Sequence, residues 1–194
     1  LLIYKLSQKN IFGDSVIGMV SSVGIAIGIL LASLGDGFNV DLFSYLFGDI
    51  LAITSQELFG SIVLSVLVIT SIIVFYQDLF AVTFDPEYSK VIGVNPKTIE
   101  KILLVLTALT VVLGIKVVGA FLVSSLIIFP SVTALQLANG FKQALGLSVI
   151  FGVTSIFLGI ITAVMLNLPA GATIVLYNFG LFMVGFFIAR ITKI

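Results

Sequence analysis

Six apolar stretches, each about 20 residues long, limit what this chain can fold into. An apolar segment of about 20 residues, folded as an α-helix, is long enough to cross the hydrocarbon core of a bilayer. The sequence therefore predicts a chain that crosses a membrane repeatedly. The expected spans are Val16–Leu34, Leu58–Tyr76, Thr98–Ile115, Val117–Ala138, Ala144–Leu166 and Ala172–Ala189.

The third and fourth spans come from a single apolar block, Ile102–Pro130, which only Lys116 interrupts. At about 1.5 Å per residue this block is too long for one crossing. We therefore expect two helices, with a turn near Gly114-Ile115-Lys116.

Composition supports a membrane protein and excludes several other classes. Hydrophobic residues make up 60% of the 194 residues, charged residues 9%, and the mean hydropathy is +1.31. A soluble domain carries about 25% charged residues, so a water-soluble globule and a disordered chain are excluded. Nine basic and nine acidic residues leave no net charge to bind nucleic acid. The predicted fold class is all-α, a polytopic protein embedded in a lipid bilayer.

Cysteine and histidine are both absent from the sequence. Disulfides, thiolate chemistry, histidine general bases and a Cys/His zinc site are therefore excluded within this chain. Charged residues at mid-depth, which mark proton relays and ion paths, are also missing from the expected spans. Energy for any pumping is therefore expected to come from another source.

The apolar segment Leu42–Ile53 is too short to cross a bilayer, at about 18 Å as a helix. We expect a re-entrant or interfacial helix there. The distribution of charge supports this choice, because with six crossings Lys116 is the one basic residue on the outer side. The others fall on the inner side, which makes both ends of the chain cytoplasmic by the positive-inside rule. These inner residues are Lys5, Lys9, Lys90, Lys97, Lys101, Lys142, Arg190 and Lys193.

Small residues and one proline mark positions of close packing or bending. Gly24 with Gly28, and Gly159 with Ala163, have the spacing that lets two helix backbones approach each other. We expect helix packing at both pairs rather than a specific dimer contact. Pro130 removes a backbone hydrogen bond within its span, so we expect a bend there, either static or a hinge for gating.

The longest inner loop has the sequence of a capped helix. Asp85 is a favourable N-cap, Pro86 suits the first helical position, and Glu87 complements the helix dipole. Gly93 supplies a left-handed stop, which predicts a two-turn helix over Pro86–Ile92 outside the bilayer. This helix is either a docking surface or a surface helix that only orders the loop.

Five stretches of the chain resemble, in the same order, membrane permeases of zinc, manganese and iron ABC importers. The most specific is the inner loop, and the others lie at the first span, the short outer segment, the fourth span and the turn before the last span. These stretches are Phe84–Val94, Asp14–Gly18, Leu46–Ile53, Val118–Val123 with Leu126–Ala134, and Leu168–Leu176.

The resemblance implies a homodimeric permease of the prokaryotic plasma membrane, bound to two cytoplasmic ATPase subunits and supplied by an external metal-binding protein. Its cargo would be a divalent transition metal ion, moved by alternating access. ATP would be hydrolysed on the separate ATPase, so this chain is expected to be neither an enzyme nor the holder of a cofactor. The expected ATPase-coupling residues are Asp85, Pro86, Glu87, Lys90, Gly93 and Val94, and the expected gating positions are Gly119 and Pro130.

Two features depart from the family pattern. Relatives usually have helices before the region that resembles Leu1–Asp14, so residues 1–194 are expected to be one permease domain that lacks upstream helices. Asn167 also stands where many relatives carry Asp, which argues against cation attraction at that outer turn.

Without His or Cys, a metal ion in this chain can use only carboxylate, amide and carbonyl ligands. Asp49 is the candidate, because a carboxylate in an apolar outer segment is costly unless it is paired or hydrated. The alternative is a helix-end cap or an interfacial charge. Asp36, Asp41 and Glu57 are expected to form a solvated acidic rim that concentrates cations.

Three other functions remain open at the level of sequence. The first is an ABC permease for a chelated metal or siderophore. The second is a transporter or channel driven by an ion gradient, which would need the intramembrane charges that are missing. The third is a structural membrane scaffold.

Overall fold

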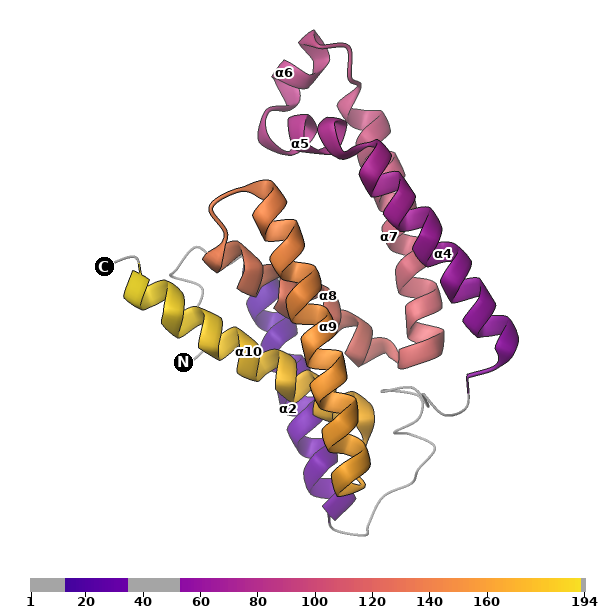
Figure 1. Ribbon diagram of the computed structural model, residues 1–194, viewed down its shortest axis with the longest axis vertical. Coiled ribbons are helices and arrows are strands. Elements are labelled where there is room, and N and C mark those ends of the chain that lie inside the picture. Colours follow the sequence, from indigo (N-terminus) through magenta and orange to yellow (C-terminus); the bar gives the residue numbers. More distant parts are fainter. Residues whose placement is uncertain (1–12, 35–52, 193–194) are drawn as a thin grey trace. The chain divides into compact units, whose positions relative to one another are not determined.

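The computed structural model describes residues 13–34 and 53–192, and every element within them is an α-helix (Figure 1). This confirms the predicted all-α class. The helices are α2 (Gly13–Leu34), α4 (Ser55–Val74), α5 (Tyr76–Phe84), α6 (Pro86–Val91), α7 (Pro96–Val118), α8 (Ala120–Leu137), α9 (Phe141–Leu166) and α10 (Ala170–Thr192).

Six of these helices, namely α2, α4, α7, α8, α9 and α10, are long and apolar enough to cross a membrane. Each corresponds to one of the six predicted spans, so the chain is a polytopic membrane protein. The predicted re-entrant segment, up to residue 52, lies outside the described residues, and so do Asp36, Asp41 and Asp49.

The break between the third and fourth spans was predicted too early. α7 continues through Lys116 to Val118, and the chain turns at Gly119, whose φ is 86°. Lys116 does not end the helix because a basic side chain in the last turn complements the negative end of the helix dipole. Gly119 does end it, because glycine adopts a positive φ without a steric penalty.

The second predicted span also differs from the structure. It was expected to reach Tyr76, but α4 ends at Val74, Phe75 leaves the helical path, and the unpredicted α5 follows. Asp78 lies in the first turn of α5, where a carboxylate is favoured by the helix dipole. Asp78 therefore marks the start of a second helix.

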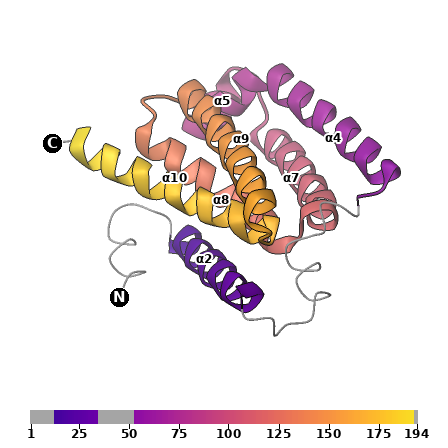
Figure 2. The ribbon, with the colours of Figure 1, turned by 60° about the horizontal axis from the view of Figure 1, so that its bottom comes forward.

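In the described part, α2, α8, α9 and α10 form one compact unit, and α4, α5, α6 and α7 form a second. In the first unit, α10 packs against α2, α8 and α9 (Figure 2). Its core includes Leu122, Ile174 and Val175, and the rings of Phe129 and Phe182 meet edge to face at 5.9 Å.

Glycines set the closest approaches in this first unit. A Cβ placed on Gly159 of α9 would lie 2.7 Å from the Cα of Ile174 on α10. With buried Ala163, this confirms the predicted packing of the second small-residue pair. Among the described residues, a Cβ on Gly24 or Gly28 of α2 would meet nothing within 4 Å, so packing at the first pair stays a prediction.

Two hydrogen bonds between side chains add direction to this packing. The Asn178 amide donates to the Ser125 hydroxyl at 3.3 Å, which joins α10 to α8. The hydroxyls of Tyr177 and Thr162 are 2.7 Å apart, which joins α10 to α9. Tyr177 and Asn178, adjacent residues of α10, therefore bind α9 and α8 respectively through polar groups that would have no hydrogen-bond partner in hydrocarbon.

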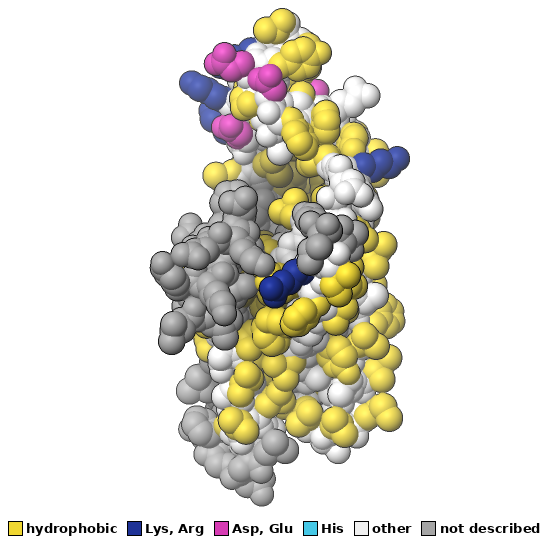
Figure 3. Space-filling view, turned by 90° about the vertical axis from the view of Figure 1, so that its left-hand side faces the viewer, with side chains coloured by type: hydrophobic (Ala, Val, Ile, Leu, Met, Phe, Trp, Pro, Cys, Tyr) yellow, Lys and Arg dark blue, Asp and Glu magenta, His cyan; other side chains and the backbone are white. Residues whose placement is uncertain are grey.

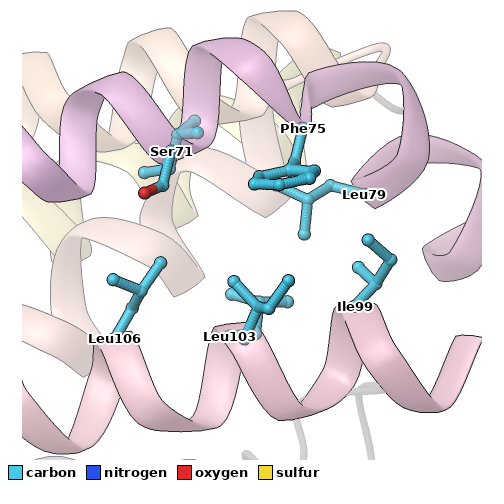
Figure 4. Close-up of a pocket in the computed structure, with 8 residues that line it drawn as sticks. Ser71, Phe75, Leu79, Ile99, Leu103 and Leu106 are labelled. Atoms are coloured by element: carbon cyan, nitrogen blue, oxygen red, sulfur yellow. The ribbon is translucent and has the colours of Figure 1, made fainter.

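The second unit is more open. α4 and α7 lie alongside each other (Figures 1 and 2). Among the described residues, the most apolar stretch of each helix contains no buried residue, and the buried residues of α7, Pro96 and Ile99, lie at its start. Between α4 and α7 is an apolar recess, into which Phe75 and Leu79 point from one side and Ile99 and Leu103 from the other (Figure 4).

Replacing Gly159 with Ala should loosen the contact between α9 and α10, because the added methyl group meets backbone atoms that cannot move aside. Overpacking of this kind costs about 1–3 kcal/mol. We expect a lower midpoint of thermal unfolding, measured by circular dichroism of the protein in detergent. Gly146→Ala is the matched control on α9, because its Cβ meets nothing within 4 Å; equal midpoints for the two variants would contradict the packing described.

Candidate functional site

The start of α6 is held by the N-cap that the sequence predicts. One carboxylate oxygen of Asp85 accepts hydrogen bonds from the backbone N–H groups of Glu87 (3.0 Å) and Tyr88 (2.9 Å). Pro86 occupies the first helical position, where its missing N–H has no partner to lose. The predicted helix is confirmed, and it ends at Val91 rather than Ile92.

The C-terminus of α6 is also capped by hydrogen bonds. The Val94 N–H donates to the Ser89 carbonyl at 2.9 Å, and the Gly93 N–H donates to the Lys90 carbonyl at 3.1 Å. With φ of 86° at Gly93, this is the Schellman pattern of a helix C-terminus. A helix of six residues has little stability of its own, so these two caps fix its geometry.

α6 packs on α5 with one face and exposes apolar side chains on the other. Ser89 is fully buried, and Val82 of α5 is buried as well. Val91 is 83% exposed and Tyr88 57% exposed, and Phe84 and Ile92 are also exposed. We name these four residues, Phe84, Tyr88, Val91 and Ile92, the α6 surface.

Charged side chains surround the α6 surface. Glu87 lies in the first turn of α6 and Lys90 in the last, and both are exposed. Figure 3 shows charged side chains gathered at the end of the second unit that carries α6, whereas apolar side chains cover the spans. An apolar patch with a charged rim, outside the apolar spans, has the composition of a protein-binding surface.

The cap that starts the next span is also as predicted. The side chain of Asn95 accepts a hydrogen bond from the Lys97 N–H at 3.1 Å, and α7 begins at Pro96. α6 is therefore joined to a membrane span by a short and well-defined connection, Ile92–Asn95. A force applied to α6 reaches α7 through few rotatable bonds.

The two predicted gating positions belong to the same helix, α8, one at its start and one in its interior. Gly119 is buried and is the N-cap of α8, directly after α7. Pro130 is buried within α8, which continues as a helix on both sides of it. A Cβ on Gly152 of α9 would lie 3.8 Å from the Pro130 ring, so Pro130 also packs against α9.

Glu57 is not part of a free acidic rim as expected. It lies in the first turn of α4, and one of its carboxylate oxygens is 3.2 Å from the Lys116 ammonium. The other closes a capping box with Thr54. The sequence Thr54-Ser55-Gln56-Glu57 carries the capping-box pattern, which was the overlooked signal.

Metal ligands do not gather within the described residues, where no group of three or more His, Cys, Asp or Glu side chains could hold an ion. Asp49 lies outside those residues, so its predicted role stays a prediction. The site that the structure does describe is therefore the α6 surface with its two caps.

Comparison with known proteins identifies the family. A profile of the ABC 3 transport family matches residues 2–189. This chain belongs to the ABC 3 transport family. The match covers nearly all of the chain, including the capped loop and all six spans.

Two similar proteins are membrane proteins of metal uptake or transport systems. The chain is 34% identical over 174 residues to the high-affinity zinc uptake system membrane protein ZnuB of Haemophilus influenzae, covering 90% of this chain and 67% of that protein. It is 32% identical over 185 residues to the manganese transport system membrane protein MntC of Listeria innocua, covering 95% and 66%.

A solved structure has the same fold. The structure described as PsaBC from Streptococcus pneumoniae in complex with Fab superposes with a TM-score of 0.70 and 31% identity, covering 95% of this chain and 67% of that one. The present chain thus spans about two thirds of the length of the relatives it matches.

Removing the Asp85 side chain should loosen α6. Asp85→Ala leaves the N–H groups of Glu87 and Tyr88 without their acceptor, at a cost of about 0.5–2 kcal/mol. We expect faster hydrogen–deuterium exchange at residues 87–92, measured by mass spectrometry in detergent or nanodiscs. Asp85→Asn retains a capping oxygen and should exchange like the wild type, whereas unchanged exchange in Asp85→Ala would refute the capping role.

Proposed function

We propose that this protein is the membrane permease of an ATP-driven importer of a divalent transition metal ion, namely zinc, manganese or iron. The observation that carries the proposal is α6, a doubly capped helix that presents apolar side chains outside the spans of an ABC 3 family chain. The zinc and manganese systems of the relatives give the class of cargo.

α6 is the coupling helix in this proposal, and its partner is a cytoplasmic ATPase subunit. Tyr88 and Val91 provide exposed apolar area, and Glu87 and Lys90 provide charges at the rim. Asp85, Pro86, Gly93 and Val94 act indirectly, because they fix the shape of the helix. Aromatic and apolar anchors within a polar rim are typical of residues that dominate protein interfaces.

Transport then follows an alternating-access cycle in a homodimer of permeases. Closure of the ATPases on ATP moves α6, and α7 transmits the displacement because a short connection joins the two helices. The boundary between the two compact units falls directly before Val118, one residue from Gly119. That coincidence supports Gly119 as the main gating hinge, with Pro130 as a second point of bending in α8.

The orientation of the chain follows from its charges. Lys90 lies in α6, and Lys97 and Lys101 lie near the start of α7, so this end lies in the cytoplasm, as do both chain ends. Metal ions then arrive from an external metal-binding protein at the opposite face, where Asp49 is the proposed contact. ATP is hydrolysed by the partner subunits, and this chain carries the cargo without a cofactor of its own.

Uptake of radioactive metal tests the proposal. The permease is expressed with its cognate ATPase and binding protein in cells that lack their own zinc and manganese importers, and ⁶⁵Zn, ⁵⁴Mn and ⁵⁵Fe are supplied separately. We expect uptake of at least one ion, abolished by an inactive ATPase. Glu87→Arg should reduce uptake strongly, because it reverses a rim charge on α6.

Lys101→Gln is the matched control, because it changes an exposed charge on α7 and leaves α6 intact. It should transport like the wild type. Uptake that persists without an active ATPase would refute the ABC mechanism. Normal uptake by Glu87→Arg would refute the role of α6.

A further inference from the structure

Glu57 binds two different groups with its two carboxylate oxygens. Oε2 accepts from the Thr54 backbone N–H (3.1 Å) and from the Thr54 hydroxyl (2.9 Å), while the Thr54 hydroxyl accepts from the Glu57 N–H (3.3 Å). Oε1 is left for the Lys116 ammonium, 3.2 Å away. The capping box therefore aims the second oxygen of Glu57 at Lys116.

Glu57 and Lys116 lie where the N-terminus of one helix meets the C-terminus of another. Glu57 lies in the first turn of α4 and Lys116 in the last turn of α7. An acid at a helix N-terminus and a base at a C-terminus are each stabilised by the helix dipole. Their contact joins the start of α4 to the end of α7.

The apolar recess and the ion pair lie at opposite ends of the two spans of the second unit. The recess is lined by the end of α4, by Leu79 of α5 and by the first half of α7 (Figure 4). Within the described residues, Glu57–Lys116 is the one ion pair. The close glycine contacts at Gly18, Gly159 and Gly185 lie in the first unit.

Position in the chain gives this pair its consequence. Lys116 precedes the turn at Gly119 by three residues, and the second unit ends at Val117. The pair therefore lies directly before the point where the two units join along the chain.

We propose that Glu57 and Lys116 form a latch that holds the start of α4 against the end of α7, directly before the turn at Gly119. Only the connection to the transport cycle rests on the proposed function. The latch itself is a property of the second unit. Lys116 is 66% exposed and Glu57 25% exposed, so the latch is weak enough to open and close readily.

Spin-label distances test the latch directly. The sequence contains no cysteine, so spin labels can be attached only at two introduced cysteines, Phe59→Cys on α4 and Val112→Cys on α7. Both positions are exposed. Distances between the labels are measured by double electron–electron resonance in nanodiscs. With the native pair we expect one dominant short distance.

Breaking the latch should reduce the ratio of short to long distances by about two- to fivefold, the range for an exposed ion pair. Glu57→Gln is the sharpest variant, because glutamine keeps the capping box and loses only the charge. Lys116→Met should have the same effect.

Glu100→Gln, which removes an acid near the other end of α7, is the matched control and should leave the distances unchanged. Distances in Glu57→Gln and Lys116→Met equal to those with the native pair would overturn the latch. This result does not depend on metal uptake, so the latch and the proposed function can fail separately.

Discussion

Hydrocarbon offers no hydrogen-bond partner to a peptide group, and the architecture of this chain depends on that constraint. Each described span satisfies its own backbone as an α-helix, and hydroxyls within the spans donate back to carbonyls of the preceding turn, as Ser22 does to Gly18. Specific polar contacts therefore concentrate at helix ends. Asp85 and Thr54 cap helices there, and Glu57 meets Lys116 there.

The two compact units use this constraint differently. The first is held by close glycine contacts and by the hydrogen bonds of Tyr177 and Asn178, which join α10 to both neighbours. In the second, the described spans have exposed surfaces, an apolar recess lies between them, one ion pair joins them, and a capped helix lies outside the apolar region. The chain thus connects a firmly packed unit to a more loosely packed one near Gly119, which suits a protein in which one part moves relative to another.

The long-range pattern of the fold was predictable because apolar length and helix caps are local signals. Six spans, the Asp85 cap and the Gly93 stop can each be read within a few residues. The predicted break was placed too early because Lys116 was taken to interrupt the helix. Lys116 instead pairs with Glu57, which is so far away in the sequence that no local pattern shows the contact. The pairs Gly159 with Ala163 and Gly24 with Gly28 have the same sequence spacing. Within the described residues, a neighbouring helix lies in close contact with Gly159 and not with Gly24, and the sequence does not show this difference.

The proposed docking of a cytoplasmic ATPase on α6 can be tested with a single cysteine at Val91. Val91 is 83% exposed and the sequence has no cysteine, so Val91→Cys reports one position. We expect this cysteine to cross-link to the ATPase with a yield that changes when ATP binds, and we expect the ATPase to protect it from a water-soluble maleimide. Equal maleimide labelling with and without the ATPase, and no cross-linked product, would contradict it.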